Sequence, residues 1–116
     1  MKSSKITFSI LLDSDNVPEK LYWDATDKNP KGEEKTLAFC VSIWDHVQHN
    51  TLKIDLWAKD MPILDMKRFY VETIGGLAES LKNASNDDYM VNEINNLCEK
   101  LGKYVTEESK KETYNG

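Results

Sequence analysis

Two histidines and an aspartate lie close together in the middle of the 116-residue chain: Asp45, His46 and His49. Imidazole nitrogens and carboxylate oxygens are ligands that zinc and non-haem iron accept, so this segment could hold a metal ion. The same residue types also suit a polar chain reversal whose histidines are solvated or hydrogen-bonded locally. A small metal- or ligand-binding domain around His46 and His49 is therefore the alternative hypothesis, while the leading one requires no cofactor.

Four carboxylates that each lie within three residues of a tryptophan are the second candidate for chemistry, and they belong to Asp24, Asp45, Asp55 and Asp60. A pair of carboxylates beside an aromatic ring is typical of glycosidases. Here Asp24 and Asp45 end predicted strands and Asp60 precedes a predicted helix, which are ordinary positions for turn and cap residues. No serine-elbow or phosphate-binding glycine motif is present. We therefore predict a protein that is not an enzyme.

The cysteines and the overall charge restrict the compartment and the partners. Cys40 and Cys98 each have apolar neighbours, which is typical of buried free thiols and predicts a cytoplasmic protein. Fifteen basic against twenty acidic residues leave a net charge of −5. The electrostatic field of an acidic protein repels the phosphate groups of nucleic acids, so no nucleic-acid partner is expected. The longest apolar run, residues 37–41, is too short for a membrane span, and no export leader is recognisable, so we expect no membrane insertion.

The first half of the chain alternates apolar and other residues with a period of two, which predicts strands over 6–12, 21–26, 35–44 and 51–58. The last two strands should form a hairpin closed by residues 45–50. One face of this hairpin is expected to point inward, with Leu37, Phe39, Val41, Ile43, Leu52, Ile54 and Leu56. On the opposite face the first of these strands is small and apolar, with Ala38, Cys40, Ser42 and Trp44, and the second strand has Lys53, Asp55 and Trp57.

The hydrophobic period changes to that of a helix after Asp60. Asp60 is the expected N-cap of a helix over 62–83, and a polar break separates this helix from a second one over 90–105. The polar segment 107–116 should add about one turn before it frays. Gly75 and Gly76 lie inside the first helix, where we expect them to allow close helix packing.

These elements predict an α+β fold in one domain, residues 1–116, ordered from about 4 to 106. Four antiparallel strands would form a meander-like sheet, with two amphipathic helices packed on one face, in the order β-β-β-β-α-α. The other face would be too apolar to remain in water. We expect it to bind a second copy or another protein, through Tyr22, Trp23, Cys40, Trp44 and Trp57, although aromatics also fill cores.

Several segments in a fixed order resemble the GldC family of gliding motility-associated proteins. They are VPEKLYWDAT (17–26), IWDH (43–46), NTLKIDLW (50–57), KDMP (59–62), MKRFY (66–70) and GGLAE (75–79). The resemblance covers about residues 5–105 and implies a small cytoplasmic protein linked to bacterial movement over surfaces, without an assigned activity or cofactor. The order of elements is also similar to that of the SecB export chaperone, which suggests a chaperone-like role in binding client segments.

Overall fold

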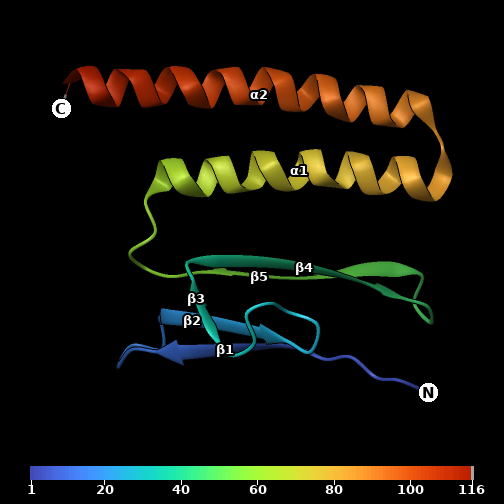
Figure 1. Ribbon diagram of the computed structural model, residues 1–116. Coiled ribbons are helices and arrows are strands. Elements are labelled where there is room, and N and C mark those ends of the chain that lie inside the picture. Colours follow the sequence, from blue (N-terminus) through green and yellow to red (C-terminus); the bar gives the residue numbers. More distant parts are fainter. Residues whose placement is uncertain (116) are drawn as a thin grey trace. The chain divides into compact units, whose positions relative to one another are not determined.

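The computed structural model describes residues 1–115, which form two compact units. The N-terminal unit ends at Met61 and contains the strands, and the C-terminal unit begins at Pro62 and contains the helices. The structure confirms an α+β chain in which antiparallel strands precede two helices (Figure 1).

The first sheet has three antiparallel strands in the order β1-β2-β3: β1 (Ile6–Leu12), β2 (Pro18–Ala25) and β3 (Glu34–Thr36). Phe8 lies opposite Trp23, so both side chains are on the same face of the sheet. The β1–β2 reversal is organised by Asp13, whose Oδ1 accepts hydrogen bonds from the backbone N–H groups of Asp15 (2.8 Å) and Val17 (3.0 Å). Hydrogen bonds of this kind, from backbone N–H groups to a nearby aspartate side chain, are typical of the turn-forming residues that follow β1.

The second sheet is a hairpin of β4 (Ala38–Asp45) and β5 (Asn50–Trp57), here called the arm. The prediction of one four-stranded sheet is wrong, because the described residues form five strands in two sheets. The predicted strand 35–44 is interrupted at Leu37. The Thr36 hydroxyl donates to the Ala38 carbonyl (3.0 Å) and accepts from the Ala38 N–H (3.4 Å) across this bend. The chain thereby leaves one sheet and enters the other.

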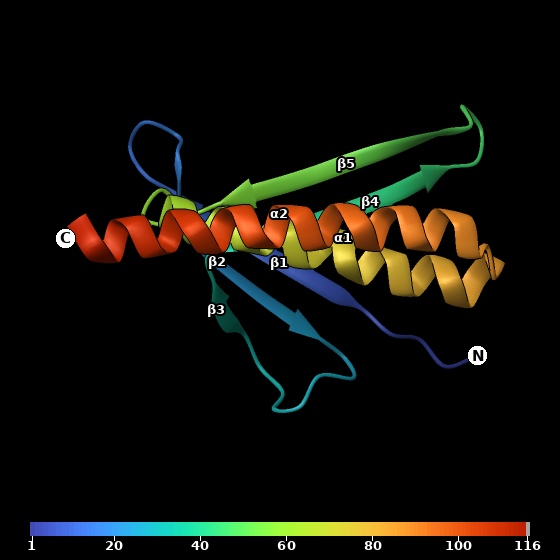
Figure 2. The same ribbon diagram turned by 90° about the horizontal axis from the view of Figure 1, so that it is seen from above.

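The two sheets of the N-terminal unit are joined at the base of the arm. The Phe8 and Phe39 rings stack with centroids 4.3 Å apart, and Leu21, on β2, has no exposed surface. Lys59, directly after the arm, donates its backbone N–H to Pro18 O (3.0 Å) and its Nζ to Asp13 Oδ2 (2.9 Å). Figure 2 shows the arm and the strands β1 and β2 diverging from this base. The tip of the arm therefore projects away from the first sheet.

The C-terminal unit is an antiparallel helix pair of α1 (Ile63–Ser85) and α2 (Asp88–Asn115). The predicted N-cap at Asp60 is wrong, since Pro62 is the cap and no side chain caps this end. The predicted polar break is confirmed. Asn86 has a left-handed conformation and donates its N–H to Lys82 O (2.9 Å), and Asp87 Oδ1 accepts from the Met90 N–H (3.1 Å).

Contacts between α1 and α2 fix their register. Lys67 Nζ lies 2.8 Å from Glu108 Oε2, and a Cβ added to Gly75 would lie 3.8 Å from Cys98 Sγ. Gly75 is thus at the expected helix contact, whereas a Cβ at Gly76 would meet nothing within 4 Å. The second helix continues to Asn115, beyond its predicted end.

That the two helices cover one face of a sheet stays a prediction. Neither helix in the described chain has the length and apolarity to cross a membrane.

Candidate interaction surface

The register of the arm brings three of the predicted anchor residues to one face. Trp44 pairs with Thr51, Cys40 with Asp55 and Ala38 with Trp57, so Cys40, Trp44 and Trp57 all project from the same side of the hairpin. Trp44 is 61% exposed and Trp57 is 45% exposed, while Cys40 is half-buried. The predicted grouping of these side chains is confirmed, and their role in binding stays a prediction.

The other face of the arm is apolar from the Phe39–Leu56 pair to the Ile43–Leu52 pair but is covered only near the base. Phe39 is 9% exposed, whereas the tip residues Ile43, Leu52 and Ile54 are 46%, 50% and 52% exposed. The expectation that these three side chains point inward is therefore wrong. The reason is that the contact with the first sheet, through Phe8, is at the base, and the two sheets diverge beyond it (Figure 2).

The tip of the arm consequently exposes large apolar side chains on both faces. They are Ile43, Trp44, Val47, Leu52 and Ile54. A two-stranded hairpin is marginally stable on its own in water, and packing against another element is what normally stabilises it. Contiguous exposed apolar residues of this kind mark interaction sites in folded proteins.

Tyr22 and Trp23 lie outside this surface, on β2 of the three-stranded sheet. They are adjacent in a strand, so their side chains project from opposite faces. Both are half-buried. The Lys28 ammonium lies 5.3 Å from the centroid of the Trp23 ring, and the Lys28 side chain itself is only 5% exposed. One side of the Trp23 ring is therefore occupied by a cation of the same chain.

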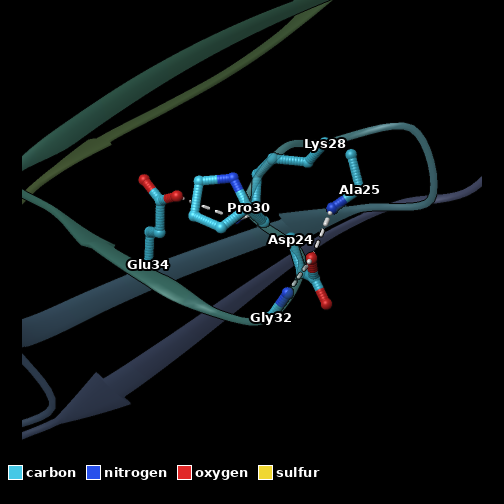
Figure 3. A network of polar contacts seen from close by, with 6 residues as sticks. All are labelled: Asp24, Ala25, Lys28, Pro30, Gly32 and Glu34. Carbon is cyan, nitrogen blue, oxygen red and sulfur yellow. Dashed lines mark hydrogen bonds and ion pairs between the residues drawn. The ribbon is translucent and has the colours of Figure 1, made fainter.

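Lys28 belongs to a loop that hydrogen bonds hold to the end of β2 (Figure 3). Asp24 Oδ1 accepts from the backbone N–H groups of Ala25 (2.9 Å) and Gly32 (3.3 Å). Lys28 Nζ donates to Pro30 O (2.6 Å) and to Glu34 Oε1 (2.9 Å). These contacts give Asp24 a structural role in the loop, as expected for a residue at a strand end.

The turn at the tip of the arm contains the candidate metal ligands. Asp45 Oδ1 accepts from the N–H groups of Val47 (2.9 Å) and Gln48 (3.1 Å), and the bond from Gln48, followed by that from Val47, lowers the pKa of this carboxyl. His49 has a positive φ of 57° and packs edge-on against Trp44, with ring centroids 6.3 Å apart. Within residues 1–115, no group of three or more His, Cys, Asp and Glu side chains is arranged to hold a metal ion.

The other charged groups with shifted pKa values support the scaffold. The Val17 N–H and then the Lys59 ammonium lower the pKa of Asp13, and the bond to Asp13 raises the pKa of Lys59. Lys67 similarly lowers the pKa of Glu108. The carboxylates of Asp13, Glu108 and Asp45 are thus held in the charged form, which is the reverse of the shift that prepares a general acid.

Sequence reasoning missed the two residues that hold the base of the arm to the first sheet. The sequence pattern places Lys59 only in the segment before the first predicted helix, and Phe8 only among the apolar residues of a predicted strand. Contacts between residues this distant in the chain leave no periodic signal. The one available clue was the run of residues Lys59–Pro62 in the family resemblance, which does not say what Lys59 contacts.

The architecture defines a class: a small α+β protein in which an apolar hairpin projects from a short antiparallel sheet and is followed by a helix pair. The chain belongs to the family described as "Gliding motility-associated protein GldC-like", whose model matches residues 18–107. The matched part includes the whole arm. No curated protein and no solved structure matches the chain.

Proposed function

We propose that this chain is a non-catalytic accessory protein of gliding motility that acts in the cytoplasm by binding protein through the arm. The observation that carries the proposal is the exposure of apolar side chains on both faces of the arm tip. Burial of apolar surface is the main favourable term in protein association, and tryptophans are frequent anchors. Membership of the GldC-like family supports a role in gliding motility. The free cysteines Cys40 and Cys98 support a location in the reducing cytoplasm.

The proposal is tested by photo-cross-linking from single positions of the chain in its native cytoplasm. A photo-reactive side chain in place of Trp44 or Ile54 should give covalent adducts with a polypeptide. The matched control replaces Tyr89, which is 74% exposed but lies on α2. Adducts from the arm positions and none from position 89 are the expected result. Absence of adducts from both arm positions would overturn the proposal.

The chaperone-like form of this function makes a narrower prediction. If the arm holds extended client segments, the wild-type protein should suppress aggregation of a chemically unfolded model protein. The Trp44→Ala, Trp57→Ala double variant should suppress it less, and Tyr89→Ala should behave as wild type. No suppression at several-fold molar excess of the wild-type chain would exclude the chaperone form while leaving association with a folded partner.

A further inference from the structure

We infer that the outer edge of β1 pairs with β1 of a second copy of this chain, antiparallel about a two-fold axis at Ser9. The inference goes beyond the proposed function, because it concerns the first sheet and leaves the arm available to another protein. Four observations carry it: outward backbone groups along β1, an uncharged and exposed edge, the contrast with the protected edge at β3, and the match of the β1 edge with itself.

The backbone direction along β1 is fixed at both ends of the strand. Lys5 O accepts from the Thr26 N–H (2.9 Å), and the Asp13 N–H donates to Val17 O (2.9 Å). Backbone groups alternate in direction along an antiparallel strand, so Lys5, Asp13 and every second residue between them face β2. The N–H and C=O groups of the other four residues face outward, on the side where β1 has no neighbouring strand within residues 1–115 (Figure 1). They belong to Ile6, Phe8, Ile10 and Leu12.

The β1 edge lacks the features that normally keep a strand edge from pairing. Its seven residues, ITFSILL, include no charged residue and no proline. Ile6, Leu11 and Leu12 are 69%, 52% and 51% exposed. A long, uncharged edge strand with exposed apolar side chains is a template for another strand. The edge of β1 is therefore suited to main-chain pairing with a second polypeptide.

The opposite edge of the same sheet is protected. β3 has only three residues, and two of them, Glu34 and Lys35, are charged. Glu34 Oε1 also lies 2.9 Å from Lys28 Nζ, in the loop before β3. Short length and charge are common means of preventing strand addition at an edge. The contrast between the two edges indicates that β1 is the pairing edge of this sheet.

A two-fold axis at Ser9 pairs the whole β1 edge with itself. Ser9 is the central residue of the strand, so the two copies of β1 lie flush at both ends. The axis places Phe8 of each copy opposite Ile10 of the other. It also places Ile6 opposite Leu12, so all four outward residues meet outward residues of the second strand. The exposed apolar side chains at the two ends thereby gain apolar neighbours.

Shifted axes leave part of the edge unpaired. An axis at Phe8 brings Leu12 of each copy opposite Ser4 of the other, which precedes the strand. An axis one residue beyond Ser9 brings Ile6 opposite the β1–β2 turn, which follows the strand. The length of the edge therefore favours the register centred on Ser9.

Charges just beyond the two ends of the edge select the antiparallel direction. Lys5 precedes β1 and Asp15 lies in the β1–β2 turn; both are exposed, and neither side chain is paired in the part of the chain that the structure describes. Asp13, in the same turn, is already paired with Lys59. Pairing about Ser9 brings the Lys5 end of each copy to the turn that carries Asp15 in the other, where opposite charges attract. Parallel pairing would bring the two Lys5 ends together, so the second copy supplies matching charge only when it is antiparallel.

Ser9 itself suits a position on the axis. Its backbone faces β2, so the two copies meet there as a non-hydrogen-bonded pair, with Cα atoms about 4.5 Å apart. The Ser9 hydroxyl donates to Glu33 Oε1 (3.2 Å) and needs no partner from the second copy. An interface of this kind is isologous, and its symmetry closes at two copies. It would join the two β1-β2-β3 sheets into one continuous sheet.

Light scattering across a range of concentrations tests dimerisation. The wild type should reach twice the 13.4 kDa chain mass. Ile10→Pro removes one outward N–H from each copy and no bond to β2, so the variant should keep its fold and dimerise at least about tenfold more weakly. The Trp44→Ala, Trp57→Ala variant of the arm should dimerise like the wild type. A wild type that stays monomeric, or a dimer that a folded Ile10→Pro variant leaves intact, overturns the inference.

Disulfide cross-linking tests the register. In a chain with Cys40→Ser and Cys98→Ser, Ser9→Cys should form a covalent dimer on mild oxidation, because Cα atoms about 4.5 Å apart are within disulfide range. Thr7→Cys is the matched control on the same face of β1. The two copies of residue 7 are separated by four residues along the strand pair, about 13 Å, and should not cross-link, whereas Thr7→Cys with Leu11→Cys should. Cross-linking through position 7 alone but not through position 9 overturns the proposed pairing.

The outcomes separate this inference from the proposed function. A monomeric wild type whose arm cross-links to other proteins overturns the β1 dimer and supports the proposed function. A dimer that is lost in the Trp44→Ala, Trp57→Ala variant is built on the arm and also overturns the inference. A dimer cross-linked through position 9, in a chain whose arm gives no adducts, supports the inference and overturns the proposed function. Circular dichroism shows whether each variant is folded, and the Ser9→Cys result does not depend on the proline variant.

Discussion

The Phe8 and Phe39 rings are stacked at a centroid distance of 4.3 Å with an interplanar angle of 20°, and this contact joins the two sheets of the N-terminal unit. Phe39 is 9% exposed, so its replacement removes a buried ring. Phe39→Ala should lower the free energy of unfolding by about 3–5 kcal/mol. Urea unfolding followed by circular dichroism measures the change. Val47→Ala at the exposed tip is the control and should change it by less than about 0.5 kcal/mol.

The Asp13 carboxylate should make stability depend on pH in the acid range. Its pKa is lowered from 3.8 in the folded chain, chiefly by the Val17 N–H and then by Lys59. A lowered folded-state pKa contributes stability that is present above the unfolded pKa and is lost as the pH falls through the folded value. The free energy of unfolding should therefore decrease below about pH 4, and Asp13→Asn should flatten this decrease.

Lys59→Met provides the matched partner for that experiment, since Lys59 is the side chain that bonds Asp13 Oδ2. The double variant should lose less stability than the sum of the two single variants, because each single variant already removes the same ion pair. Additive losses would show that the ion pair does not couple the β1–β2 turn to the segment after the arm.

Gly76→Ala should stabilise the protein by about 1 kcal/mol, because alanine is the better helix former and the added Cβ meets nothing within 4 Å. Thermal or urea unfolding measures the gain. Gly32→Ala is the contrasting variant: Gly32 has φ +106°, so a side chain there is strained and should destabilise. A loss of stability at position 76 would mean that this helix face is packed against something in solution.

Truncation of Trp44 should reduce binding of an environment-sensitive apolar dye with little effect on folding. Trp44 is 61% exposed, so Trp44→Ala removes exposed apolar area and few buried contacts. We expect a change in unfolding free energy within about 1 kcal/mol and a clear decrease in dye fluorescence. Tyr89→Ala should leave the dye signal nearly unchanged. Equal dye binding by wild type and Trp44→Ala would place the apolar site elsewhere.

Periodicity predicted most of the elements and one face of the arm. The alternation over 51–58 and the change of period after Asp60 correspond to β5 and α1 as observed. The same reasoning placed Cys40, Trp44 and Trp57 on one face, because side-chain direction follows directly from strand geometry.

The division into two sheets was not predictable from the same signals. A strand that bends at Leu37 keeps its alternation on both sides of the bend, so 35–44 reads as one strand. The bend depends on the Thr36 hydroxyl, and Thr36 is itself a favourable strand residue. The apolar pattern also gives no information on how far a neighbouring sheet extends, which is why Ile43, Leu52 and Ile54 were expected to be buried.

Amide hydrogen exchange of the arm is the most direct test of protein binding through the arm, because it reports on backbone groups that a bound polypeptide would cover. In the purified protein the amides of Thr51 and Lys53, which point away from β4, should exchange quickly, and they should be protected in native cytoplasm. The amide of Ile54, which points toward β4, should change less. Equally fast exchange of the Thr51 and Lys53 amides in purified protein and in native cytoplasm would contradict binding through the arm.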